Sequence, residues 1–133
     1  MKKFVTFILY SVAVLQSYGQ TSESFLKLGD NSAKIGDYTG AIVDYTKAIE
    51  LNPKVADAYF QRGNAKINLL DYRGAIVDYD KAIELHPKDE KAYHNRGIAK
   101  NLLNDKDGAC LDWSKAGELG DVNVYDLIKK YCN

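Results

Sequence analysis

The sequence predicts an all-α protein built from stacked pairs of helices. When residues 41–74 are aligned with residues 75–108, 21 of 34 positions are identical without a gap, so the chain contains an internal repeat. Within one repeat, apolar residues recur with a period near 3.6 over residues 56–69 and again over residues 72–85. That spacing is typical of two amphipathic helices.

The composition is that of a folded protein with balanced charge. The 133 residues are 46% hydrophobic and 27% charged, with 18 Lys and Arg against 18 Asp and Glu. This hydrophobic fraction argues against a disordered chain. The lack of a basic excess argues against a protein that binds nucleic acid. We therefore expect one domain or a short array of repeats.

The first part of the chain predicts an export signal. Two lysines precede an apolar run over residues 4–15, and the small residues Ser17 and Gly19 follow it. A helix of that length reaches only about 18 Å, which is too short for a hydrocarbon core of about 30 Å. We expect residues 1–19 to be a cleaved signal peptide, residues 20–133 to be the mature chain, and the protein to reside in the periplasm or cell envelope. The alternative is an uncleaved membrane anchor.

Cap residues mark the ends of the expected helices. Asp37, Asp71 and Asp105 recur at one position of the repeat, where each is expected to cap the second helix of its pair. Pro53 and Pro87 are expected to end second helices, because proline cannot continue the hydrogen-bond ladder.

The turn between the two helices of each pair is expected to need a residue in the left-handed backbone conformation, with positive φ. Gly36 suits that conformation and Asn104 tolerates it, but Leu70 fits poorly, so the second turn is expected to differ. A glycine in each first helix and an alanine in each second helix also recur, and we expect these small residues to face one another. They are Gly29, Gly63 and Gly97 against Ala41, Ala75 and Ala109.

These spacings resemble the tetratricopeptide repeat, whose pattern places an aromatic, a small residue, Ala, an aromatic, Ala and Pro within 34 residues. The matching residues are Phe25, Gly29, Ala41, Tyr45, Ala48 and Pro53; Tyr59, Gly63, Ala75, Tyr79, Ala82 and Pro87; and Tyr93, Gly97, Ala109, Trp113 and Ala116. The third unit departs from the pattern at Gly120 and Asp121, where the proline would come. The resemblance implies an α-solenoid of three hairpins, with repeats at about 22–55, 56–89 and 90–123 and first helices lining a concave face.

The chain after the third unit is expected to close the array. Residues 124–132 are too few for a further unit and predict a capping helix, as terminal repeats require. Cys110 and Cys132 lie at equal distances along the chain from Asp121, so an antiparallel hairpin would bring them to the same height. Because an exported protein meets an oxidising compartment, we expect a disulfide between them. Two buried free thiols are the alternative.

Charged residues also recur inside the repeats. Arg62 and Arg96 precede mid-helix glycines, and each second helix carries one Asp, namely Asp44, Asp78 and Asp112. A partly buried guanidinium needs an anionic partner, so Arg–Asp ion pairs are expected to link the helices. The sequence leaves open which Asp pairs with which Arg.

No motif of catalysis or metal binding stands out in the sequence. It has no phosphate loop and no HExxH helix, and its two histidines and two cysteines are not spaced as zinc ligands. We therefore expect neither an enzyme nor a protein with a cofactor, a metal or a direct small-molecule substrate.

The resemblance implies protein binding, because members of this family hold an extended peptide or a partner's helix in the concave groove. The groove positions would be Leu26, Asp30, Ala33 and Lys34 in the first unit, Phe60, Gln61, Asn64 and Asn68 in the second, and Lys91, His94, Asn95, Ile98 and Asn101 in the third. Amides satisfy both the donors and the acceptors of a peptide backbone, and Phe60 and Ile98 offer apolar anchors. His94 is a candidate pH-sensitive contact.

Two functions fit these residues: an envelope adaptor that binds a peptide or helix of another protein, or a structural subunit of an envelope or secretion assembly that docks through convex or end faces. Some family members clamp a chaperone's terminal carboxylate with Lys, Asn and Arg. Leu26 and Asp30 stand where Lys and Asn would be, and Asp30 would repel a carboxylate. Self-association through the first unit is a third possibility, because Phe25 and Leu26 have no preceding unit to cover them. Membrane association is expected only through a partner or an uncleaved signal.

Overall fold

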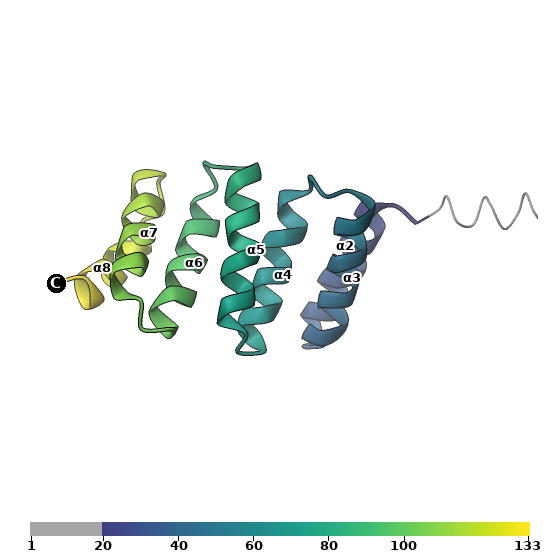
Figure 1. The fold of residues 1–133 in the computed structure, drawn as a ribbon, viewed down its shortest axis with the longest axis horizontal. Coiled ribbons are helices and arrows are strands. Elements are labelled where there is room, and N and C mark those ends of the chain that lie inside the picture. Colours follow the sequence, from purple (N-terminus) through teal and green to yellow (C-terminus); the bar gives the residue numbers. More distant parts are fainter. Residues whose placement is uncertain (1–19) are drawn as a thin grey trace, which may run out of the picture.

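The computed structural model describes residues 20–133, which form a row of helix hairpins closed by one further helix (Figure 1). The helices are α2 (Ser22–Lys34), α3 (Tyr38–Leu51), α4 (Ala56–Asn68), α5 (Tyr72–Leu85), α6 (Glu90–Leu102), α7 (Lys106–Glu118) and α8 (Val124–Tyr131). No strand occurs within this part of the chain. The expected signal peptide, residues 1–19, lies outside the described residues.

The hairpins stack as a solenoid. Each first helix packs against the second helix of its own hairpin, and α4 and α6 also pack against the second helix of the hairpin before. The first helices α2, α4 and α6 also contact one another in sequence, which places them on the inner side of the curve. In the α3–α4 and α5–α6 connections, the Tyr59 and Tyr93 hydroxyls donate to the carbonyl oxygens of Pro53 and Pro87 at 3.1 Å. The rings of these two tyrosines therefore pack between helices, while their hydroxyl groups form hydrogen bonds.

The N-caps of the second helices follow one local motif. The side chains of Asp37, Asp71 and Asp105 accept hydrogen bonds from the backbone N–H groups of the glycines three residues later, at 2.8, 2.9 and 2.9 Å. A Cβ atom on Gly74 would lie 2.2 Å from the Asp71 carboxylate. The glycine therefore leaves room for the cap.

The turn inside the second hairpin is the same as its neighbours, against our expectation. Leu70 has φ +63°, Asn104 has φ +63° and Gly36 has φ +81°. Leu70 thus adopts the left-handed conformation in spite of its Cβ, and its side chain is 72% exposed. Because the tight turn places the capping aspartate, packing of the two helices overrides the preference of this one residue.

The mid-helix glycines face aromatic rings rather than the alanines that we expected. A Cβ on Gly29 would lie 2.5 Å from the Tyr45 ring, and one on Gly97 would lie 2.5 Å from the Trp113 indole. A Cβ on Gly63 would likewise lie 2.8 Å from the Tyr79 ring. The large ring of the second helix needs the space that a missing side chain leaves on the first.

The first hairpin presents a polar outer side. Ser24 and Asn31 of α2 occupy the positions of Ala58 and Ala65 in α4, which are buried against α3. Phe25 is half-buried, with the Lys47 ammonium 5.4 Å from its ring centroid. Polar residues thus stand where a further hairpin would need small apolar ones.

Helix α8 covers the other end of the array. Val124 is fully buried against Ala109, Trp113 and Ala116, and the Tyr131 ring packs 5.8 Å from that of Trp113. Leu127 and Ile128 face inward, whereas Tyr125 is exposed. Val124, Leu127, Ile128 and Tyr131 follow the spacing i, i+3, i+4 and i+7 and so form one inward face of the helix, which does not include Tyr125.

Cys110 of α7 and Cys132, directly after α8, form a disulfide. Their Cα atoms are 5.8 Å apart and they are separated by 22 positions along the chain. The bond joins the start of α7 to the end of α8, so it fixes both ends of the terminal hairpin.

Candidate functional site

The inner face of the solenoid carries the residues predicted to line a groove. All of them are half-buried or exposed, so none is fully enclosed by the protein. They are Leu26, Asp30, Ala33 and Lys34 on α2; Phe60, Gln61, Asn64 and Asn68 on α4; and Lys91, His94, Asn95, Ile98 and Asn101 on α6. Their roles differ between the three hairpins.

An amide cluster occupies the middle of this face. The Asn64 side-chain oxygen accepts hydrogen bonds from the Tyr79 hydroxyl at 2.7 Å and from the Asn95 amide at 2.8 Å. The Asn64 amide donates in turn to Gln61 at 3.2 Å. Burial raises the pKa of Tyr79 far above its usual range, and the nearby Asp78 charge adds to this, so the hydroxyl stays a donor. The cluster therefore links α4, α5 and α6 and fixes the orientation of its amides.

A small pocket of about 210 Å³ opens beside the amide cluster. Its walls combine Asn64 and Asn95 with the apolar Ile67 and Ile98. Polar groups that fix orientation, set among apolar ones, are the usual composition of a binding site.

The first-hairpin side of the groove is acidic. The Tyr45 hydroxyl donates to Asp30 at 2.9 Å, and burial together with this hydrogen bond raises the pKa of Tyr45. Partial burial and the charges of Asp30 and Asp89 raise the pKa of the Asp57 carboxyl. Neighbouring carboxylates at this side therefore disfavour further negative charge.

The third-hairpin side contains a residue pair that sequence reasoning missed. His94 Nδ1 is hydrogen-bonded to Asp121, a buried residue of the α7–α8 turn. The Asn123 backbone N–H also donates to Asp121, at 2.9 Å. Burial by itself would raise the pKa of Asp121, but the hydrogen bonds from His94 and Asn123 outweigh it and lower that pKa. The departure of the third unit from its repeat pattern at Gly120 and Asp121 was the available signal.

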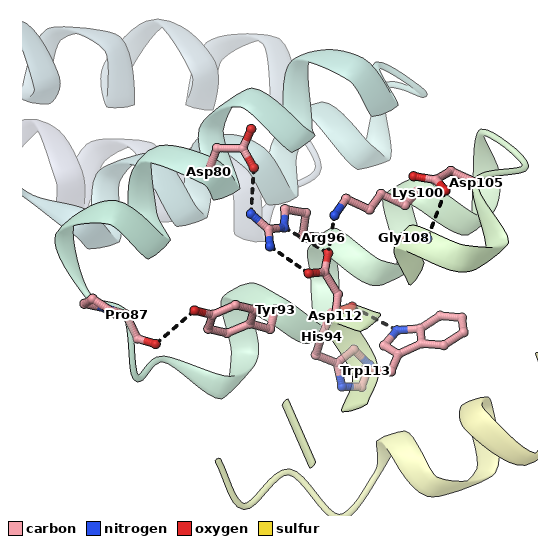
Figure 2. A network of polar contacts seen from close by, with 10 residues as sticks. All are labelled: Asp80, Pro87, Tyr93, His94, Arg96, Lys100, Asp105, Gly108, Asp112 and Trp113. Carbon is pink, nitrogen blue, oxygen red and sulfur yellow. Dashed lines mark hydrogen bonds and ion pairs between the residues drawn. The ribbon is translucent and has the colours of Figure 1, made fainter. Parts of the chain in front are cut away.

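His94 is therefore not a free groove contact. Its ring is held by Asp121. Its backbone carbonyl accepts a hydrogen bond from the Trp113 indole N–H at 3.2 Å, as Figure 2 shows. A larger pocket of about 340 Å³ lies here, between Phe60, Lys91, His94 and the α7–α8 turn.

The arginines occupy structural ion pairs on the side of the first helices away from the groove. Arg62 donates to both carboxylate oxygens of Asp78, at 2.9 and 2.7 Å. Arg96 makes the same bidentate pair with Asp112, which raises the pKa of this guanidinium. Each aspartate also pairs with a lysine one helical turn after the arginine: Asp78 with Lys66 and Asp112 with Lys100, both at 2.9 Å. Figure 2 shows the pair of Lys100 and Asp112.

Asp44 does not belong to this set, against our expectation. Among the described residues no ion pair includes it, because Leu28 stands where the other two hairpins carry arginine.

The two arginines also contact the hairpin that precedes their own, each through a different kind of partner. Arg62 donates to the Thr46 hydroxyl at 3.1 Å, whereas Arg96 pairs with the Asp80 carboxylate at 2.8 Å.

Within residues 20–133, no group of His, Cys, Asp and Glu side chains could hold a metal ion. None of the helices described is both long enough and apolar enough to cross a bilayer.

Comparisons with known proteins agree with this architecture. Residues 29–69 match the family model described as TPR repeat, and residues 56–89 match the model described as tetratricopeptide repeat. An array of such helix hairpins defines the class, and the chain is a tetratricopeptide repeat (TPR) protein. The search of curated proteins found no match.

Several solved TPR domains are similar over most of their length. The first TPR of Spaghetti (RPAP3), bound to the HSP90 peptide SRMEEVD, has a TM-score of 0.82 and 26% identity, over 85% of this chain and 91% of that one. The Arabidopsis OM64 TPR domain has a TM-score of 0.82 and 29% identity, over 84% and 94%. The second TPR domain of human RPAP3, in complex with the HSP70 peptide SGPTIEEVD, has a TM-score of 0.80 and 26% identity, over 84% and 95%.

Proposed function

We propose that this protein is a non-enzymatic interaction module that binds a peptide segment or helix of another protein in its concave groove. The amide cluster around Asn64 carries the proposal. Its side chains are pre-oriented by hydrogen bonds to Tyr79 and Asn95, and it adjoins a pocket with apolar walls. Similar TPR domains hold the HSP90 and HSP70 peptides named above, which supports a peptide ligand here.

The peptide class differs from those acidic examples. Leu26 and Asp30 stand in the groove where a carboxylate clamp would need Lys and Asn, and Asp57 adds a second carboxylate beside Asp30. A segment ending in several carboxylates would meet repulsion there. The groove is therefore better suited to a neutral or basic segment. A titration in which an acidic-terminated peptide binds more tightly than its neutralised analogue would contradict this assignment.

We further propose that the protein works in the cell envelope as an adaptor. The apolar run before residue 20 supports export, and the Cys110–Cys132 disulfide is of the kind that persists in oxidising compartments. Mass spectrometry of the native protein should find a chain that starts near Gln20 and contains no free thiol. An intact N-terminus together with two alkylated cysteines would argue against this location.

The alternative is a structural subunit that docks through its convex face. One observation favours it: Val43, Val77 and Leu111 occupy the same position in the three second helices and are 49%, 65% and 73% exposed. A row of aliphatic side chains along the outside of the solenoid is an apolar surface that an assembly partner could cover.

A capture experiment separates the two functions. Tagged native protein is compared with a groove variant (Phe60→Ala, Asn64→Ala, Ile98→Ala) and a matched convex variant (Val43→Ser, Val77→Ser, Leu111→Ser). Circular dichroism first establishes that both variants fold. A partner lost only by the groove variant supports the adaptor. A partner lost only by the convex variant supports the docked subunit and overturns the proposal.

A further inference from the structure

The groove continues past the third repeat onto the α7–α8 turn. The pocket of about 340 Å³ is formed by Phe60 of α4, by His94 and Asn95 of α6, and by Asp121 and Val122 of the turn. Asn95 also lines the pocket beside the amide cluster. The two pockets are therefore neighbours, and a segment lying over the amide cluster runs directly into the larger one.

The α7–α8 turn forms one wall of the larger pocket, and contacts within the protein hold this wall in place. Asp121 is buried and accepts from the Asn123 backbone N–H at 2.9 Å and from the Asn123 side-chain amide at 3.1 Å, while its other oxygen is bonded to His94. Val124, directly after the turn, is fully buried in the terminal core. The wall therefore stays in place before a ligand arrives, which lowers the entropic cost of binding.

The chemistry of the pocket favours an uncharged guest. His94 and Asp121 are bonded to each other. The other two charged residues of the lining, Glu90 and Lys91, have opposite signs, so neither sign of charge dominates the pocket. Two of the lining side chains are apolar: Val122 is 69% exposed, and the half-buried Phe60 ring is held 5.9 Å from that of Tyr79. Asn95 and Asn123 add neutral polar groups to the lining. A volume near the small end of ligand sites, about 300–1,000 Å³, suits one side chain and its flanking backbone.

We propose that this end pocket binds a single aliphatic or aromatic side chain, of the size of Leu, Ile, Met or Phe, from the same peptide segment that contacts the amide cluster. The inference rests on the proposed function and adds the position and chemistry of the ligand's main anchor. Val122 is the specificity-determining residue, because it is the apolar wall that the repeat pattern itself does not supply.

The test uses a library of random peptides displayed on phage and selected against the purified protein. A selected peptide is then synthesised with a fluorophore, and its dissociation constant is measured by anisotropy. We expect Val122→Asp to weaken binding about tenfold or more, which corresponds to at least about 1.4 kcal/mol. The matched control is Leu111→Asp on the outer face of α7, whose side chain is equally exposed; we expect it to change binding by less than about twofold.

A double-mutant cycle assigns the contact. Replacing the apolar anchor of the peptide by Ala should weaken binding to the native protein and should cost little more with Val122→Asp, because both changes remove one contact. A selected peptide whose affinity is the same for native protein and Val122→Asp overturns this inference and leaves the proposed function standing. Failure to select any peptide contradicts both.

Discussion

The ion pair of Arg62 and Asp78 allows a sharp test of what holds the second hairpin together. Arg62→Leu removes two charge-assisted hydrogen bonds of 2.9 and 2.7 Å from a carboxylate that is only 2% exposed. Lys66 remains 2.9 Å from one of the two carboxylate oxygens. Leucine is an instructive replacement, because Leu28 occupies this position naturally in the first hairpin.

The expected cost is about 3 kcal/mol. Breaking a buried pair by removing one partner typically costs about 3–5 kcal/mol, because an uncompensated charge stays behind. Lys66 retains part of the compensation for Asp78, which places the value at the low end of that range. For a domain of this size a loss of about 3 kcal/mol lowers the midpoint of thermal unfolding by about 10 °C.

Urea denaturation followed by circular dichroism measures this cost. The matched control is Lys81→Leu, which removes a lysine from the exposed pair with Glu84 at 3.1 Å; such a pair contributes about 0.5 kcal/mol or less. If Arg62→Leu destabilises the protein no more than Lys81→Leu does, the carboxylate of Asp78 is not held as the structure indicates, and the reasoning fails.

Three other perturbations have a defined direction. Leu70→Gly should stabilise the protein by about 0.5–1 kcal/mol, because it relieves a left-handed residue, whereas Leu69→Gly, at φ −90°, should destabilise it; equal effects in thermal melts would contradict this. Replacing Cys110 and Cys132 together by Ser should cost about 3 kcal/mol, the chain entropy of a 22-residue loop, and a melt unchanged from that of the oxidised native protein would disprove it. The pKa of Asp121 is lowered, so its contribution to stability is present above its unfolded-state pKa of about 4 and is lost as pH falls through the folded-state pKa. Asp121→Asn should therefore flatten the acid limb of a stability curve below about pH 4, and an unaltered limb would count against the pair with His94.

The helices were predictable from the sequence because a residue that recurs in every repeat has the same packing role in each hairpin. Where a residue recurs every 34 positions, as the capping Asp37, Asp71 and Asp105 do, one local rule accounts for all copies. Leu70 shows the limit of such rules. Its own preference disfavours the turn that it adopts, but the contacts of two whole helices decide the conformation.

The end of the groove was less predictable, because its residues do not repeat. Nothing in the other repeats indicates that Asp121 and Val122 form the wall of a pocket. The hydrogen bond between Asp121 and His94 joins residues that are 27 positions apart in the chain. The expectation that Asp44 takes part in an ion pair was wrong for a related reason: in the first hairpin alone, Leu28 stands at the position of the arginine. Where the sequence departs from the repeat pattern, the contacts of individual residues therefore cannot be predicted from the pattern and require the three-dimensional structure.

The unequal junctions between hairpins give the array a weak end and a strong end. Arg62 reaches back to a neutral hydroxyl on Thr46, whereas Arg96 reaches back to the carboxylate of Asp80. Because stability in a solenoid is close to a sum over neighbouring units, fraying should begin at α2 and stop short of the terminal hairpin, which the disulfide closes. A ligand lying along the groove would then be released by peeling from the first hairpin, while its far end stayed held beside the α7–α8 turn.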